Sequence, residues 1–370
     1  MSMQHAERTA SAAVRAGFLS EATARRIETA ILPLAALLAG MIAFSIFLAF
    51  LGKPPLDFYL LVYKAGFGTA FSWTNTLARA APLLLAALCV ALPARLGLVI
   101  IGGEGAIVLG GVAAGAVATL MPGLPGPAGI LLMALAGALV GGLWIGGVGA
   151  LRHLRGVNET IASLLMAYVA IALMNHLVEG LLRDPASLNK PSTAPLPAAW
   201  RIGEIPGLGV HWGLAVGILG CILSWVLIER TTWGFAARIV GGNLRAARIQ
   251  GLPAGRLVIG FTALGGAFAG LAGMFEVAAV HGSANASLAA GYGYTGILIA
   301  FLARHNGLAI VPAAILLAGL EASSGLIQRR MALPDATVLV LEGMVFIAIL
   351  LSDTFQDRLK FLSFLERRQK

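Results

Sequence analysis

The sequence predicts an all-α protein that crosses a membrane about ten times. Of its 370 residues, 58% are hydrophobic and only 12% are charged, whereas about 25% of the residues in an average soluble domain carry charge. A soluble protein of this composition would expose large apolar patches. The mean hydropathy of +0.87 and the 47 glycines agree with a polytopic membrane protein, because small residues let transmembrane helices pack closely.

Ten apolar segments account for these crossings, since a bilayer core needs about 20 apolar residues per helix. They cover residues 30–51, 77–94, 97–120, 128–151, 159–182, 211–229, 257–280, 290–303, 307–327 and 337–352. The eighth is short and bounded by glycine, which predicts a half-helix or re-entrant segment whose ends are covered by protein or line a cavity. We expect the segment 52–76, with its Trp and Tyr residues, to lie along the outer interface.

The distribution of Lys and Arg predicts the orientation. With the N-terminus inside and ten crossings, 18 of these residues lie inside and 8 outside, which predicts that both termini are cytoplasmic. Residues 1–29 then form a cytoplasmic tail, either an amphipathic helix on the membrane or an unstructured chain, and residues 353–370 form a second tail. The membrane domain spans residues 30–352. Its long loop 183–210 lies outside, and its basic loop 230–256 lies inside.

Several functional classes are disfavoured by missing motifs. The one Gly-Lys pair, Gly52-Lys53, precedes proline, so the chain cannot bind ATP through a P-loop of its own. The six histidines are scattered and form no metal-binding motif. No G-x-S-x-G motif indicates an intramembrane hydrolase. Cys89 and Cys221 lie in apolar runs and show no reason to pair. The net charge of +9 is explained by topology, so no nucleic-acid partner is expected.

A short basic helix is predicted inside loop 230–256, in the stretch "GGNLRAARIQGLPAG". Asn243 is a good N-cap, Leu244 to Gln250 are compatible with a helix, Gly251 suits the left-handed position after it, and Pro253 prevents continuation. Such a helix is about 10 Å long and would be marginal in water by itself. Either the membrane domain or a partner must hold it. The residues alone leave open whether it is a stray turn or a docking element.

Four segments resemble permease subunits of ABC importers of the nucleoside and simple-sugar family, which also includes ribose and branched-chain amino acid permeases. The loop "TTWGFAARIVGGNLRAARIQGLPAGR" is similar to the coupling loop of that family, with its motif positions filled by Gly234, Arg238, Gly241, Asn243, Ala246, Ala247, Arg248 and Gly251. The other segments are 81–111, 156–170 and 291–325. Ile101 and Ala167 stand where the family usually has asparagine. The resemblance covers about residues 80–350.

The resemblance implies a type II importer fold with ten helices in a bacterial cytoplasmic (inner) membrane. Two permeases, identical or homologous, pair around a pathway, and each docks one ABC ATPase. A periplasmic or lipoprotein substrate-binding protein delivers the solute. ATP and Mg²⁺ belong to the ATPase, so this chain would carry no cofactor, no metal and no catalytic residue.

The resemblance also implies which residues couple to the ATPase. They are Asn243, Leu244, Arg245, Ala246, Ala247, Arg248 and Gly251. We expect the small face of Ala246, Ala247 and Gly251 to fit into the ATPase, and Arg245 and Arg248 to serve orientation or topology. Nucleosides or purines are the first candidate solutes, because the segments "GVNETI" and "GYGYTG" look most like that branch. Simple sugars are second.

The candidate pathway residues are Glu104, Tyr168, Asn175, Tyr292 and Tyr294. Tyrosine combines an apolar face with a hydroxyl, which suits sugars and bases, although packing or an interface position is the simpler role for each one alone. An acid at membrane depth must face protein, water or solute, so Glu104 could line the pathway or brace the core.

Further acidic residues are expected to be structural. Glu276, Glu321 and Glu342 are interpreted as carboxylates near helix ends that hold backbone or a nearby arginine, and Asn158 and Glu159 as a helix cap. A different class, an ATPase-independent secondary transporter, would require a buried charge pair. Glu104 could supply one half of that pair, and the apolar segments show no matching cation.

Overall fold

The computed structural model describes residues 34–356, without the side chains of residues 353–356, and this part of the chain is helical throughout its regular structure. It forms two compact units. The larger comprises Leu56–Asp335. The smaller includes the helix Leu34–Phe50 and α13 (Ala336–Gln356). The predicted N-terminal tail 1–29 and nearly all of the C-terminal tail 353–370 lie outside the described residues.

Each of the ten predicted segments coincides with an apolar helix. Seven of these helices are long and apolar enough to cross a membrane: α3 (Ala70–Ala94), α4 (Gly103–Leu120), α5 (Gly126–Arg155), α6 (Glu159–Glu179), α7 (Gly213–Arg230), α10 (Ala254–Phe275) with the π-helical turns η2 (Glu276–His281), and α12 (Gly307–Met331). The other three apolar helical stretches of the described residues are shorter: Leu34–Phe50, Ala286–Leu302 with α11 (Tyr292–Leu302), and Ala336–Ser352 of α13. Ten crossings therefore remain a prediction, whereas an all-helical, multi-pass architecture is confirmed.

The predicted boundary at residue 77 was wrong. A helix, α2 (Pro55–Gly66), occupies part of the segment 52–76, and α3 begins at Ala70. Polar side chains interrupt the apolar run before residue 77, but their hydroxyl groups form hydrogen bonds within this part of the chain, so they do not end the helix. Thr69 caps α3 by accepting a hydrogen bond from Ser72 N at 3.0 Å, and the Thr76 hydroxyl donates to the Gly66 carbonyl at 2.8 Å. The early start places Arg79 well inside a membrane-length helix.

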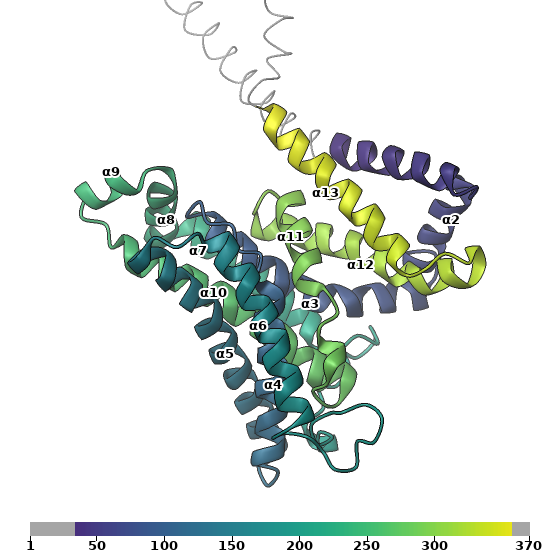
Figure 1. Ribbon diagram of the computed structural model, residues 1–370, viewed down its shortest axis with the longest axis horizontal. Coiled ribbons are helices and arrows are strands. Elements are labelled where there is room, and N and C mark those ends of the chain that lie inside the picture. Colours follow the sequence, from purple (N-terminus) through teal and green to yellow (C-terminus); the bar gives the residue numbers. More distant parts are fainter. Residues whose placement is uncertain (1–33, 357–370) are drawn as a thin grey trace, which may run out of the picture. The chain divides into compact units, whose positions relative to one another are not determined.

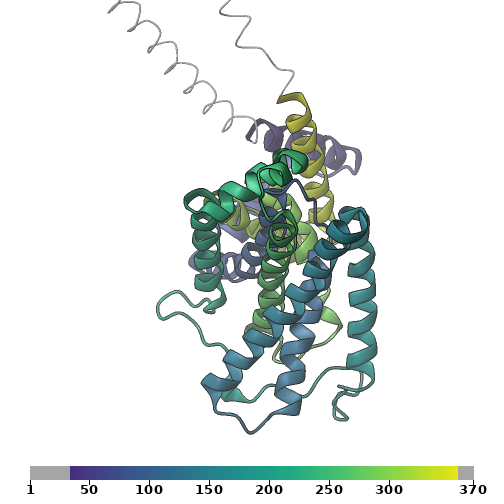
Figure 2. The same cartoon turned by 90° about the vertical axis from the view of Figure 1, so that its left-hand side faces the viewer.

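The core of the larger unit is built around α10, which packs against α3, α4 and α5. Figure 2 shows α4 and α5 joined by a short turn, with α6 beside them. Glycine makes the close approach possible. A Cβ added to Gly270 of α10 would overlap the Gly137 carbonyl of α5, and one added to Gly273 would overlap the Ile107 carbonyl of α4. Larger side chains at these positions would force the helix backbones apart.

The long loop 183–210 is fixed onto one end of the larger unit. Trp200 is fully buried, and its indole N–H donates to the Leu124 carbonyl at 3.2 Å. Thr193 exchanges hydrogen bonds with Ala284, one from its backbone N–H to the Ala284 carbonyl at 2.9 Å and one from Ala284 N to its hydroxyl at 3.0 Å. The loop therefore covers the segment that follows η2.

Candidate functional site

The short helix of loop 230–256 forms as the sequence predicts. After α8 (Thr232–Gly242), the helix α9 covers Leu244–Ile249, and Figure 1 shows both extending beyond the ends of α7 and α10. The Asn243 side chain accepts a hydrogen bond from Ala246 N at 3.0 Å. Gly251 has φ +75°. Its N–H bonds the Arg248 carbonyl, and Leu252 N bonds the Ala247 carbonyl, both at 3.0 Å. These paired bonds are a Schellman motif.

The membrane domain itself holds α9 in place. Ala247 is fully buried and belongs to a cluster with Ala237 and Val240 of α8, Leu92 of α3 and Leu257 of α10. A helix of six residues is too short to be stable alone, so this cluster supplies the stabilisation that the helix needs. The membrane domain therefore holds the helix by its inner side, and docking of a partner on the other side remains a prediction.

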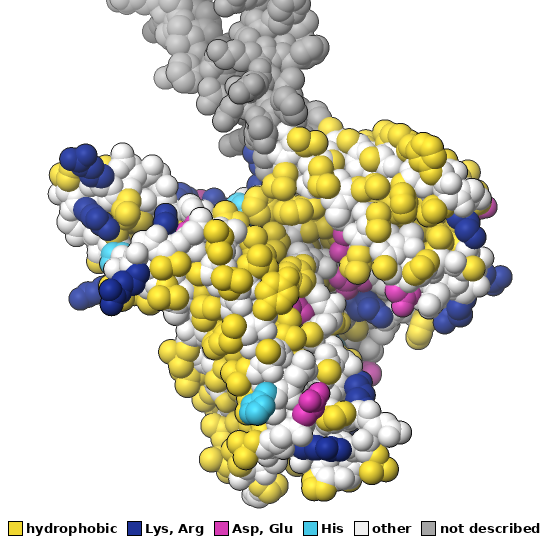
Figure 3. All heavy atoms as spheres, viewed as in Figure 1, with side chains coloured by type: hydrophobic (Ala, Val, Ile, Leu, Met, Phe, Trp, Pro, Cys, Tyr) yellow, Lys and Arg dark blue, Asp and Glu magenta, His cyan; other side chains and the backbone are white. Residues whose placement is uncertain are grey.

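The buried position of Ala247 corrects one expectation from the sequence. Ala247 points into its own domain and cannot form part of a surface open to a partner. Leu244 is instead 41% exposed and Ile249 80% exposed, and both arginines of the helix, Arg245 and Arg248, are exposed. Figure 3 shows basic and apolar side chains together over this projecting part of the molecule. The surface offered by α9 is thus two apolar side chains flanked by two cations.

A network of charges connects the loop to three other elements. The Arg238 guanidinium of α8 pairs with Glu229 at the end of α7 at 2.8 Å. Arg95, which caps α3, lies 4.0 Å from the same carboxylate and donates to the His305 carbonyl at 2.9 Å. Burial and the Arg95 cation lower the pKa of His305 to about 4, so this side chain is neutral at pH 7. The turn between α11 and α12 is thereby joined to α3, α7 and α8.

A second polar site lies within the helices of the larger unit. Arg79 of α3 is close enough to Glu276 of η2 and to Glu321 of α12 for their charges to interact. The Thr295 hydroxyl of α11 hydrogen-bonds Glu321. The Nε2 atom of His281 lies 3.5 Å from Glu276 Oε2. We call Arg79, Glu276, Thr295 and Glu321 the polar cluster.

The polar cluster also corrects the sequence analysis. The sequence predicts no matching cation in the apolar segments, yet Arg79 is one. A helix that begins at residue 77 would place Arg79 near its end, whereas α3 begins at Ala70 and places Arg79 well inside. Its placement among "TNTLARAAP" could have been found by extending the helix to its Thr69 cap. Glu276 and Glu321 do lie near an arginine, as expected, but Glu321 lies in the middle of α12 rather than near a helix end.

Glu104 braces two helices. Its two carboxylate oxygens accept hydrogen bonds from Gly291 N at 2.7 Å and from Gly293 N at 2.6 Å, at the N-terminus of α11. A carboxylate there satisfies free N–H groups and the positive helix end. Because both oxygens are engaged, the geometry favours the bracing role over solute contact. α11 has 11 residues, about 16 Å, so it is as short as the sequence predicts.

The remaining candidate pathway residues fall in two places. Tyr292 lies within electrostatic range of Glu276, Glu321 and Arg79, beside the polar cluster. Tyr294 and Tyr168 lie near each other, and they are 40% and 60% exposed.

Asn175 lies two turns after Tyr168 on the same face of α6 and is half-buried. The cap at the start of this helix is confirmed. Asn158 accepts a hydrogen bond from Ile161 N at 3.1 Å, and Glu159 pairs with Arg152 at 3.2 Å.

These features define a multi-pass α-helical membrane protein. Its loop helix α9 packs against the membrane domain at one end, and charged side chains are buried between its helices. Comparison with known proteins assigns it further. The chain belongs to the family described as branched-chain amino acid transport system, permease component, whose pattern matches residues 72–350. A permease component is the transmembrane, non-catalytic subunit of an ABC transporter. The family excludes the ATPase-independent secondary transporter as the class of this protein.

Named relatives cover most of the chain. It is 33% identical to the glucose ABC transporter permease protein TsgB13 of Haloferax volcanii, over 88% of each protein. It is 30% identical to the guanosine ABC transporter permease protein NupP of Bacillus subtilis, over 80% of this chain and 86% of the relative. It is 24% identical to the nucleoside ABC transporter permease protein NupB of Lactococcus lactis, over 85% and 89%.

Proposed function

We propose that this permease, paired with a second permease, forms the pathway of an ABC importer for nucleosides. The guanosine and nucleoside permeases among its relatives support this solute class. Tyrosines beside buried carboxylates and an arginine support it chemically, because aromatic faces stack on bases while charged groups bind ring hydroxyls. Glucose or a similar sugar is the second candidate, favoured by the similarity to the glucose permease.

The proposal includes a type II fold with ten crossings and both termini in the cytoplasm of a bacterium. Without Arg79, which lies within α3, the distribution of Lys and Arg is 18 inside to 7 outside, and it supports this orientation. Loop 230–256 is then cytoplasmic and docks one ATPase. Loop 183–210 is then periplasmic, on the side from which the substrate-binding protein delivers the solute.

The coupling role is supported by one observation: α9 packs against the membrane domain on its inner face and leaves its outer face exposed. Ala247 is buried in the membrane domain, while Leu244 and Ile249 are exposed with no apolar cover among the described residues. A force applied to the outer face by an ATPase would therefore be transmitted to the membrane domain rather than absorbed by a flexible loop.

From α9 the signal has a continuous route into the membrane. Arg238, Glu229 and Arg95 connect α8 and α7 to the turn after α11. α11 carries Thr295, which holds Glu321 of the polar cluster. In this mechanism ATP binding biases one of two packed arrangements of these elements, and the polar cluster is closed in one arrangement and open to the solute in the other.

The solute is tested by uptake into proteoliposomes that contain this permease, its partner permease, its ATPase and its binding protein. We expect labelled guanosine to accumulate with ATP, and excess unlabelled nucleoside to compete while excess glucose does not. Accumulation of labelled glucose but not of labelled guanosine would identify the sugar as the solute. Uptake of neither compound would contradict both candidates.

A further inference from the structure

A continuous groove runs between α5 and α10 on the surface of the larger unit. One part of it has a volume of about 600 Å³ and is lined only by Ala, Gly, Leu and Ile, among them Leu139 and Gly147 of α5 and Ala263 of α10. A second hollow of about 630 Å³ adjoins it and shares Ile259. A Cβ added to Gly147 would meet nothing within 4 Å. The part of the groove beside Gly147 is therefore open and apolar.

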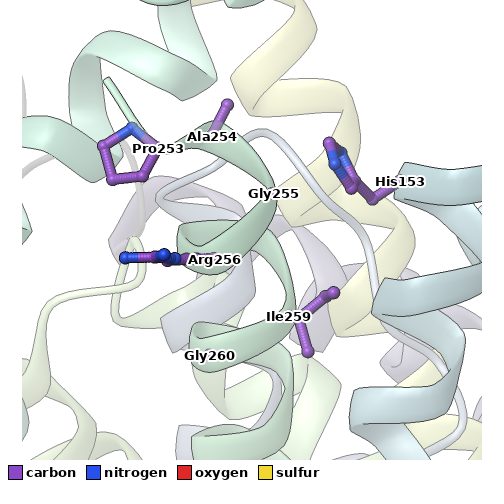
Figure 4. A pocket seen from close by; sticks show the side chains of 7 residues that line it. All are labelled: His153, Pro253, Ala254, Gly255, Arg256, Ile259 and Gly260. Atoms are coloured by element: carbon purple, nitrogen blue, oxygen red, sulfur yellow. The ribbon is translucent and has the colours of Figure 1, made fainter. Parts of the chain in front are cut away.

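One end of the groove is basic. His153 of α5 and Arg256 of α10 line the end hollow. Figure 4 shows His153 facing the first turn of α10, and Arg256 extending from the same turn away from α5. Arg256 is exposed, and the described residues give its guanidinium no hydrogen bond or ion pair. The positive N-terminus of α10 lies at the same end. By contrast, Arg152 nearby is already paired with Glu159.

The apolar part and the basic end of the groove lie along the same face of α10. Arg256, Gly260, Ala263 and Ala267 recur at intervals of three and four residues along α10, so they lie on one face of the helix. A single elongated molecule lying in the groove would therefore meet apolar surface along its length and a free cation at its end.

We propose that this groove binds one anionic phospholipid, with an acyl chain along α5 and α10 and its phosphate at Arg256. The chain spans a membrane, so the groove faces acyl chains at high concentration, and basic pockets between transmembrane helices bind acidic headgroups. A transmembrane helix of a second permease would fill the apolar part but would not use the unpaired cation. Charge complementarity therefore favours the lipid.

The test is native mass spectrometry of the purified transporter complex, delipidated and then titrated with phosphatidylglycerol or with phosphatidylcholine of the same chains. We expect one phosphatidylglycerol per permease, bound at least ten-fold more tightly than phosphatidylcholine. Arg256→Gln should abolish this preference, and Gly147→Leu, which fills the groove, should remove binding of both lipids. Gly325→Leu on α12, where a Cβ also meets open space, and Arg329→Gln are the matched controls and should leave binding unchanged.

Equal binding of the two lipids by the unmodified complex would overturn the proposal. Unchanged selectivity in Arg256→Gln would overturn it as well. If Gly147→Leu instead released the second permease from the complex, the groove would be an interface between permeases. None of these readouts depends on the transported solute, so the lipid site stands or falls separately from the proposed function.

Discussion

The coupling surface of α9 can be tested with Ile249→Glu. Ile249 is 80% exposed, so the substitution changes no packing within the permease, and a surface change of this kind alters stability by less than about 0.5 kcal/mol. Burial of an isoleucine side chain against the ATPase would contribute about 1.5–3 kcal/mol. At about 1.4 kcal/mol per factor of ten, its loss should weaken ATPase binding by roughly ten- to a hundred-fold.

The assay is copurification of the ATPase with the tagged permease, together with the thermal stability of the permease alone. Leu188→Glu is the matched control, because Leu188 is 81% exposed on loop 183–210, away from α9 in the chain. Ala247→Trp should behave in the opposite way to Ile249→Glu. It overpacks a buried site, at a cost of about 1–3 kcal/mol, and should lower permease stability. Full ATPase binding by Ile249→Glu would refute the assignment of this surface.

Three further predictions concern the membrane domain. Gly270→Leu should lower the thermal midpoint of unfolding by several degrees or prevent folding, because overpacking costs about 1–3 kcal/mol or more. Gly260→Leu on the same helix places its side chain in open space and should leave the midpoint unchanged. Equal midpoints for the two variants would contradict the packing of α10. Arg79→Gln removes the cation beside Glu276, so it should abolish solute uptake while the ATPase still copurifies with the permease. Normal uptake by this variant would show that the polar cluster has no part in transport. The pKa of His305 is lowered to about 4, so stability should fall as pH drops from about 6.5, and His305→Asn should flatten this dependence in thermal melts.

The helices could be predicted from the sequence because their signals are local. Apolar length located all ten segments, and the caps of α9 at Asn243 and Gly251 follow directly from side-chain and backbone preferences. Both caps are present with the expected hydrogen bonds. The boundary of α3 failed because hydropathy averages over polar residues, whereas Thr69 and Thr76 are satisfied by hydrogen bonds that a window average does not represent.

The sites were harder to predict because they depend on contacts between distant segments. The motif around α9 identified the loop but not its faces, and only packing against Leu92 and Leu257 shows that Ala247 points inward. The polar cluster joins residues from α3, η2, α11 and α12, which are separated by up to about 240 positions in the sequence. The sequence leaves open whether Glu104 braces the core or lines the pathway, because its two hydrogen bonds go to the start of α11, nearly 190 positions away.

The most direct test of the coupling mechanism is whether solute uptake requires the ATPase at α9. Proteoliposomes with the complete transporter should accumulate labelled guanosine on addition of ATP. Proteoliposomes without the ATPase subunit, or with the Ile249→Glu permease, should not accumulate it above the background of empty vesicles. If guanosine accumulated equally fast without the ATPase, the proposed coupling through α9 would be contradicted.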